Sequence, residues 1–158
     1  MTIKLREAGY IDREDIWDWY IDPISRQMSG KTESVNWDTF KLWFDNVIES
    51  EVHFMFIGIR EGKEKIGLSR FDILEKNRLV RVSLTLNPTY RGRGLSSKFL
   101  KSSINKFRNF MDSDLTATIR KENKPSIKCF ERVGFYFYKS DHSFNYYRKK
   151  SSRNSIST

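Results

Sequence analysis

The feature that most constrains this chain is an apolar strand joined, through a short loop with two glycines, to an amphipathic helix. The strand ends at Leu86, the loop is Arg91-Gly-Arg-Gly94, and apolar residues recur from Leu95 to Phe107 at helical spacing. Such a loop can turn backbone N–H groups toward one point at the positive end of a helix. A phosphate-binding loop is one interpretation, but Gly-x-Gly alone is weak evidence, and by itself it indicates a plain strand–helix turn more often.

The segment lacks two common phosphate-binding motifs. The dinucleotide fingerprint needs a third glycine and a βαβ unit, and a P-loop needs Gly-Lys before Ser or Thr. Residues 52–59, 65–74 and 79–86 are strand-like and separated by turn residues, which is typical of an antiparallel meander. Neither motif therefore describes this loop.

The whole chain predicts elements in the order β-α-α-β-β-β-α-β-α-β-β. An aromatic helix around Trp17 stops at Asp22-Pro23, a polar loop follows over residues 27–36, and a second helix begins near Trp37. Beyond the glycine loop and its helix we expect a strand, a helix ended by Gly134 and two closing strands. The order predicts an α/β (α+β) fold with a mixed, mostly antiparallel central sheet and helices on both faces.

Length and composition favour one globular domain. At 158 residues and 38% hydrophobic, the chain is long enough for one core and too apolar for disorder. We expect a single domain over residues 1–148 and a polar C-terminal tail over residues 149–158. The apolar stretches are far shorter than the roughly 20 residues of a membrane span. The N-terminus lacks the apolar region of a signal peptide, so we expect a cytoplasmic protein without a membrane partner.

Charge and cysteine usage narrow the partners. Lys and Arg outnumber Asp and Glu by 29 to 20, which favours an anionic partner. The aromatic residues fall at core spacing, so we expect no nucleic acid. The only cysteine, Cys129, cannot form an internal disulfide, and with two histidines in the chain we expect no metal. Cys129 is interpreted as a small buried apolar residue.

Two segments resemble the GNAT superfamily of N-acetyltransferases. Arg91-Gly-Arg-Gly-Leu-Ser96 is similar to its acetyl-coenzyme A loop, Gln/Arg-x-x-Gly-x-Gly/Ala. The stretch from Asn123 to Phe135 is similar to its Asn-x-x-Ala/Ser-x-x-x-Tyr/Phe-x-x-x-Gly-Phe pattern. The resemblance covers residues 2–148. It implies the GNAT fold, acetyl-CoA as cosubstrate and transfer of acetyl to a small-molecule primary amine.

The resemblance also implies how acetyl-CoA is held. In that family the strand before the loop separates from its neighbour, and its backbone pairs with the pantetheine arm. Here an amide near Leu84 is the expected oxyanion donor. The expected cofactor-binding residues are Leu84, Leu86, Arg91, Gly92, Arg93, Gly94, Leu95, Ser96, Asn123, Ser126 and Phe130.

Proton transfer has several candidates. Asp72 and Ser83 are expected near the reaction centre, to take a proton from the amine or to make structural hydrogen bonds. The family often protonates the leaving thiolate with a Tyr where this chain has Phe130. A thiol has a reference pKa of about 8.5, so departure without an acid is tolerable. Tyr138 is the candidate substitute, with packing as its alternative role.

The acceptor has the weakest sequence signal. Ser69, and Arg26 with Met28 in the predicted polar loop, are the expected acceptor-binding residues. The opening residues and Ile66–Asp72 resemble enzymes that acetylate nucleotide-linked amino sugars, and ribosomal-protein N-terminal acetyltransferases share part of the opening. A nucleotide-linked amino sugar, a protein N-terminus, another small amine and a catalytically silent acyl-CoA sensor all stay open. We expect a monomer or homodimer.

Overall fold

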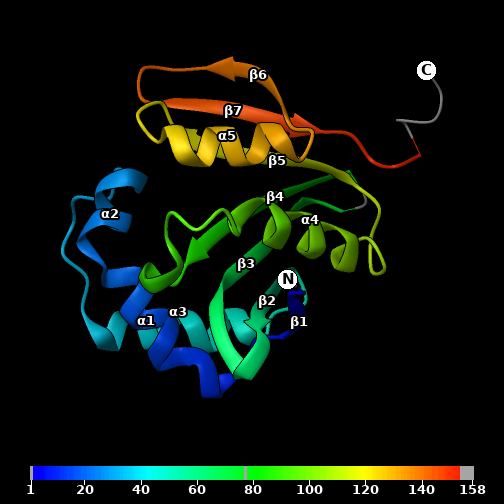
Figure 1. The fold of residues 1–158 in the computed structure, drawn as a ribbon. Coiled ribbons are helices and arrows are strands. Elements are labelled where there is room, and N and C mark those ends of the chain that lie inside the picture. Colours follow the sequence, from blue (N-terminus) through cyan, green and yellow to red (C-terminus); the bar gives the residue numbers. More distant parts are fainter. Residues whose placement is uncertain (1, 77, 154–158) are drawn as a thin grey trace.

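A computed structural model describes residues 2–76 and 78–153, which form a seven-stranded sheet with helices on both sides (Figure 1). The strand order is β1-β2-β3-β4-β5-β7-β6. Neighbouring strands pair antiparallel except β4 and β5, which are parallel. The mixed, mostly antiparallel sheet is confirmed. The strands are β1 (Lys4–Glu7), β2 (His53–Arg60), β3 (Glu64–Glu75), β4 (Leu79–Leu86), β5 (Asp114–Arg120), β6 (Tyr136–Ser140) and β7 (Phe144–Lys149).

The helices divide between the two faces of this sheet. One cluster joins side chains of α4 and α5 to β3, β4, β5 and β7, and another joins α1 and α3 to β2 and β3. No described helix is long and apolar enough to cross a membrane. The helices are α1 (Arg13–Ile21), α2 (Pro23–Ser29), α3 (Trp37–Ile48), α4 (Ser96–Phe107) and α5 (Lys124–Arg132), with short 3₁₀ turns η1 (Tyr10–Asp12), η2 (Glu61–Lys63) and η3 (Pro88–Tyr90).

Aromatic residues form the centre of the larger core. The rings of Phe71 on β3 and Phe107 on α4 stack with centroids 4.4 Å apart, and both side chains are fully buried. Phe56 packs edge-on against Phe71. Burying such rings is the main stabilising contribution of a face-to-face helix–sheet contact. The apolar spacing of residues 95–107 thus predicts which face of α4 meets the sheet.

Helix α2 is absent from the sequence prediction. The Asp22 carboxylate accepts a hydrogen bond from the Ser25 amide at 2.9 Å and caps α2, and Pro23 takes the first turn, where no N–H is needed. Gly30, with φ of 71°, ends the helix. Asp22 and Pro23 therefore both end α1 and begin α2. Arg26 and Met28, which the sequence analysis places in a loop, both lie on α2.

The predicted boundary at residue 148 falls inside β7, which ends at Lys149. The buried Ser151 donates its amide to Asp114 at 2.8 Å, and the Ser152 amide donates to Asp112 at 3.0 Å. These carboxylates satisfy backbone donors, so the chain follows the domain up to residue 153. Residues 154–158 of the predicted tail lie outside the described residues.

A buried carboxylate joins the N-terminal elements to the sheet. Asp12 is fully buried and accepts two hydrogen bonds from Arg6, both at 2.8 Å, and one from the Gly9 amide at 2.9 Å. Lys65 on β3 pairs with the same carboxylate at 2.7 Å. Burial alone would raise the pKa of Asp12, but the hydrogen bonds from Arg6, Lys65 and Gly9 lower this pKa to about 2. β1, η1 and β3 are therefore held by one ionised group.

Candidate active site

The sheet opens in its middle, between β4 and β5. These strands pair only from Leu79 to Arg81, opposite Asp114 to Thr116. β4 continues to Leu86, and β5 stays paired with β7 as far as Arg120. Figure 1 shows the two strands diverging toward the left of the view, where α2 lies. The described residues leave both facing strand edges unpaired beyond Thr116.

The backbone of β4 faces this gap with alternate residues. The Asn87 amide donates to the Ile66 carbonyl of β3 at 2.9 Å. Backbone groups alternate sides along a strand, so Thr85 also faces β3, whereas the N–H and C=O of Leu84 and Leu86 point into the gap. These groups can pair with an extended amide-containing ligand as a neighbouring strand would.

The glycine loop lies at the open end of the gap. Its ends are anchored by Tyr90 and Leu95, both 5% exposed, while the four residues between them are exposed. Gly92 and Gly94 have φ of 76° and 71°, a left-handed conformation that favours glycine. A Cβ at either position would meet no other atom within 4 Å. The loop backbone is therefore approachable from outside.

The loop leads directly into α4, whose first turn has no side-chain cap. Ser96 is the first helical residue, one position after Leu95, where the predicted helical spacing begins. The uncapped amides of a 12-residue helix carry partial positive charge and lack intrahelical partners. The loop and the helix head together can bind an anion through backbone donors.

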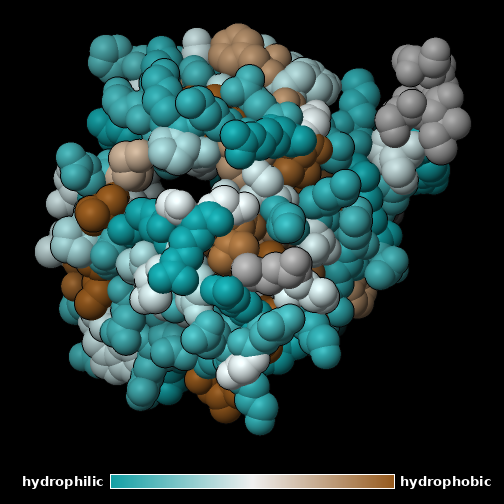
Figure 2. Space-filling view, in the orientation of Figure 1, coloured by the Kyte–Doolittle hydropathy of each residue, from teal (hydrophilic) through white to brown (hydrophobic). Residues whose placement is uncertain are grey.

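A cleft of about 370 Å³ connects the gap, the loop and α5. Figure 2 shows an opening in the surface where β4, the loop and α5 surround this space. Its lining contains the cations Arg91, Lys128 and Arg132 and no carboxylate, which suits a diphosphate. The predicted site residues that line it are Met28, Leu84, Leu86, Arg91, Gly92, Gly94, Leu95, Ser96, Asn123 and Ser126.

Two predicted cofactor-binding side chains lie elsewhere. Arg93 is exposed and stacks over the Tyr90 ring at 5.2 Å. Phe130 is buried and packs edge-on against Phe135, with centroids 4.9 Å apart, and it does not line the cleft. An apolar ring in place of the family's Tyr has no reason to stay at a polar edge. The Phe130 side chain therefore packs in the hydrophobic core.

Arg91 joins the loop to α2. Its guanidinium donates to the Asp22 carboxylate at 2.6 Å and to the Ser25 hydroxyl at 2.8 Å. Burial opposes ionisation of Asp22, but the Ser25 amide and Arg91 lower the pKa of this carboxyl. Arg91 thus holds one wall of the cleft in place, with its charge balanced by Asp22.

The head of α5 forms the opposite wall. The Asn123 side chain accepts from the Ser126 amide at 3.3 Å and caps this helix. One turn later Cys129, 4% exposed, reaches the cleft. Burial raises the pKa of the Cys129 thiol, and hydrogen bonding to Ser96 and Ser97 only partly offsets this. Cys129 is buried as predicted and is also part of the cleft wall.

The predicted proton-transfer residues do not meet at the cleft. Asp72 is nearly buried, and its carboxylate is shared by His53 at 2.6 Å, Arg70 at 3.2 Å and Arg81 at 3.3 Å. These three partners occupy the carboxylate and leave it no contact with the cleft. Ser83 lies opposite Arg70, on the same face of the sheet as Asp72.

The other predicted catalytic and acceptor residues are also dispersed. Ser69 is fully buried in the sheet, and its hydroxyl has no partner among the described residues. Tyr138 is on β6, beneath the guanidinium of Arg148. Arg26 stacks over the Tyr20 ring at 5.4 Å and donates to the Glu33 carbonyl. Of the predicted acceptor residues only Met28 lines the cleft.

Sequence reasoning missed half of the cleft wall. The missed residues of α2 belong to a helix that the sequence does not predict. Thr85 and Tyr90 lie within the predicted strand and loop, but they are not predicted to line a site. Lys128, Cys129 and Arg132 follow Pro125 at helical spacing, a signal that could have placed them on one face. The residues missed are Ile24, Ser25, Ser29, Thr85, Tyr90, Ser97, Pro125, Lys128, Cys129 and Arg132.

Comparisons with known proteins agree with this geometry. The family described as "Acetyltransferase (GNAT) domain" matches residues 2–136. YwnH of Bacillus subtilis (strain 168), named provisionally as a phosphinothricin acetyltransferase, is 29% identical over 140 residues, 85% of this chain and 83% of YwnH.

Solved structures show the same fold at low identity. Spermidine N-acetyltransferase from Vibrio cholerae, in complex with CoA and spermine, has a TM-score of 0.83 at 13% identity and covers 95% of this chain and 96% of its own. N-acetyltransferase PseH from Campylobacter jejuni, with acetyl coenzyme A, has a TM-score of 0.71 at 19% identity, covering 96% and 100%. Since the family match spans most of the sheet and both walls of the cleft, the chain belongs to the GNAT acetyltransferase family and is an N-acetyltransferase that uses acetyl-CoA.

Proposed function

We propose that the protein transfers acetyl from acetyl-CoA to a small primary amine by direct attack within the gap between β4 and β5. The observation that carries the proposal is the end of the β4–β5 ladder at Arg81 and Thr116. It leaves the amides of Leu84 and Leu86 unpaired beside an uncapped helix head. These groups fit the pantetheine arm and the diphosphate of a coenzyme A thioester.

Each part of the cleft has one task in this mechanism. The amides of residues 91–96, with Lys128 and Arg132, hold the diphosphate, and the backbone of Leu86 aligns the arm. The Leu84 N–H donates a hydrogen bond to the carbonyl oxygen as negative charge develops there. Acetyl-CoA supplies an activated acyl group whose carbon the amine attacks. Alignment of the two reactants supplies much of the rate.

In this proposal solvent water that enters the open cleft takes the proton of the amine. Asp72 is ion-paired, and Phe130 offers no proton to the leaving thiolate. The thiolate then departs unaided, which costs about 2 kcal/mol near pH 7 relative to the thiol. The N–H of Leu84 that faces the gap favours an enzyme over a silent sensor, because it can act as the oxyanion donor.

The acceptor is a small amine. A nucleotide-linked amino sugar, which the sequence resemblance implies, is one such acceptor. Protein N-termini are less favoured because α2, fixed through Arg91 to Asp22, narrows the open end of the gap. A panel of sugar nucleotides, amino acids, polyamines and N-terminal peptides, followed by release of free thiol, identifies the class.

The decisive variant is Leu84→Pro. Proline removes the N–H that faces the gap and no ladder bond to β3, as tolerated at a strand edge. We expect acetyl-CoA binding by calorimetry within a few-fold of the parent and a kcat lower by about 10²-fold. Leu86→Pro is the matched control, because it removes the next gap-facing N–H and should raise the KM for acetyl-CoA instead. Full kcat in Leu84→Pro, or no binding of acetyl-CoA by the parent chain, overturns the proposal.

A further inference from the structure

A row of polar side chains crosses the sheet on the face opposite α4 and α5. Asp72, Arg81, Thr116 and Arg148 are direct partners on β3, β4, β5 and β7. Side chains alternate along each strand, so this row points away from the residues that pack with α4 and α5. Those residues are Phe71, Val80, Val82, Leu115, Ala117 and Tyr147.

Arg81 and Arg148 stand on either side of Thr116. Two strand spacings place their Cα atoms about 10 Å apart. Thr116 between them is short, and its hydroxyl donates to the Tyr147 carbonyl at 3.1 Å. Two arginine side chains at this separation can close over one anion, each with a fork of N–H donors.

Neither guanidinium is fully compensated. The Arg81 side chain is 42% exposed and shares the single charge of Asp72 with Arg70 and His53. Arg148 stacks 4.1 Å above the Tyr138 ring, and its buried Nε has no hydrogen-bond partner among the described residues. The row therefore carries excess positive charge.

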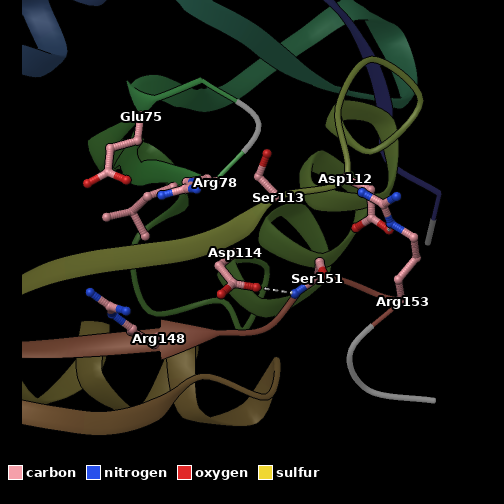
Figure 3. A pocket seen from close by; sticks show the side chains of 9 residues that line it. Glu75, Arg78, Asp112, Ser113, Asp114, Arg148, Ser151 and Arg153 are labelled. Atoms are coloured by element: carbon pink, nitrogen blue, oxygen red, sulfur yellow. Dashed lines mark hydrogen bonds and ion pairs between the residues drawn. The ribbon is translucent and has the colours of Figure 1, made fainter. Parts of the chain in front are cut away.

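Asp114, on the strand next to Arg148, does not neutralise this arginine. In Figure 3 the side chains of Arg148 and Asp114 point in different directions, and Asp114 accepts a hydrogen bond from the Ser151 amide at 2.8 Å. No described carboxylate lies within ion-pairing distance of Arg148. Arg148 also lines a cavity of about 530 Å³ at the start of β4, whose other charged residues are Arg78, Arg153, Glu75, Asp112 and Asp114.

This row lies close to the reaction centre. Arg81 and Thr116 form the last rung before the gap, and Arg81 precedes Leu84 by three residues, about 10 Å of strand. An arginine side chain that extends along the strand brings its guanidinium closer to Leu84 than this Cα separation. A group bound by the row and an amine at Leu84 can belong to one small molecule.

We propose, on the basis of the proposed function, that the acceptor is an amine that carries an acidic group and that Arg81 and Arg148 bind this group. The acid is a carboxylate, phosphonate, phosphinate or phosphate. A polyamine such as spermidine lacks it and is repelled by the row. A nucleotide-linked amino sugar has it in its diphosphate.

The test compares amines that carry an acidic group with matched amines that lack it. O-phosphoethanolamine against ethanolamine, β-alanine against β-alaninamide, and a nucleotide-linked amino sugar against the free amino sugar are assayed by thiol release. We expect kcat/KM at least about tenfold higher for the acidic member of at least one pair, the effect of one charge-assisted hydrogen bond. The pair with the largest ratio identifies the source of the acid. Spermidine exceeding every acidic amine overturns the inference.

Substitutions of Arg81 and Arg148 test whether this row causes the preference for acidic amines. Arg81→Gln and Arg148→Gln should each reduce the acid-to-neutral ratio by about tenfold without changing the KM for acetyl-CoA. Arg148→Lys keeps the charge and should retain part of the ratio, which separates charge from packing on Tyr138. Lys101→Gln removes one exposed charge from α4, on the opposite face, and should leave the ratio unchanged. Ratios unaffected by both Gln variants contradict the inference.

A binding measurement separates this inference from the proposed function. Calorimetry with the preferred acidic amine should show binding to the parent chain that either Gln variant weakens about tenfold. Without thiol release for any amine, the proposed function fails while the binding result still decides the role of the row. If the acidic amines neither bind nor react, the inference fails.

Discussion

The glycines of the loop act through backbone conformation alone. Gly94 and Gly62, in the η2 turn, have φ of 71° and 82°, and neither would place a Cβ near another atom. Alanine in the left-handed region costs about 1 kcal/mol, so Gly94→Ala and Gly62→Ala should lower the free energy of unfolding similarly. Only Gly94→Ala should also weaken acetyl-CoA binding, by about tenfold, because its loop would relax. Urea titration and calorimetry measure both effects. Equal losses of affinity would show that the loop holds no diphosphate.

Cys129 provides a probe of the cleft without any substitution. It is the only cysteine, and burial raises its pKa, so the reactive thiolate is scarce below pH 9. We expect slow labelling by a disulfide reagent at pH 8, faster labelling as the pH rises above 9, and further protection by acetyl-CoA. Absorbance of the released thiol follows the reaction. Rapid labelling at pH 7 that acetyl-CoA leaves unchanged contradicts this placement.

What the sequence predicts about single residues depends on how local their role is. Gly92, Gly94, Ser96 and Asn123 act through backbone and capping geometry encoded within a few neighbours, and all four line the cleft. Asp72 is different. Its partners come from β2, β3 and β4, so no local pattern reveals that its charge is already shared. Contacts of that kind require the register of the sheet.

At the scale of elements, the open edge of β4 should be detectable in the exchange rates of its individual amides. The amides of Thr85 and Asn87 face β3, whereas those of Leu84 and Leu86 face the gap. Hydrogen exchange followed by NMR should therefore find fast exchange at Leu84 and Leu86 and slow exchange at their neighbours. Acetyl-CoA should slow the two fast amides selectively. Uniform protection along β4 without the cosubstrate would mean that the edge is already paired.

Element prediction succeeds where periodicity is long and fails where two signals share residues. The strand before the loop is predicted with its observed bounds, Leu79–Leu86. At Asp22-Pro23 the same two residues end α1 and start α2, and a seven-residue helix is too short for periodicity to reveal. The separation of β4 from β5 is implied by family resemblance alone, because no residue pattern marks where a parallel ladder ends.

At the scale of the molecule, one carboxylate connects elements far apart in the chain. The pKa of Asp12 falls from 3.8 to about 2 on folding, so its ionised form stabilises the fold above pH 4, and this contribution disappears as the pH falls from 4 to 2. Asp12→Asn should lower the free energy of unfolding at pH 7 by at least about 2 kcal/mol. The difference from the parent chain should shrink below pH 4.

Urea titrations at pH 7, 4 and 2.5 measure this difference. Asp15→Asn is the control, because Asp15 pairs with the same Lys65 at 2.7 Å but is 49% exposed. An exposed pair contributes less than about 1 kcal/mol, so its effect should be small at every pH. A larger loss of unfolding free energy for Asp15→Asn than for Asp12→Asn would show that the exposed Lys65–Asp15 pair, and not buried Asp12, connects these elements.

The break in the β4–β5 ladder has a consequence beyond catalysis. Unsatisfied strand edges are where foreign chains attach and where local opening begins. A metabolite that fills the break acts as a missing strand and favours the folded form by mass action. If acetyl-CoA fills the break as proposed, the free energy of unfolding of this enzyme rises with the concentration of the compound that it consumes.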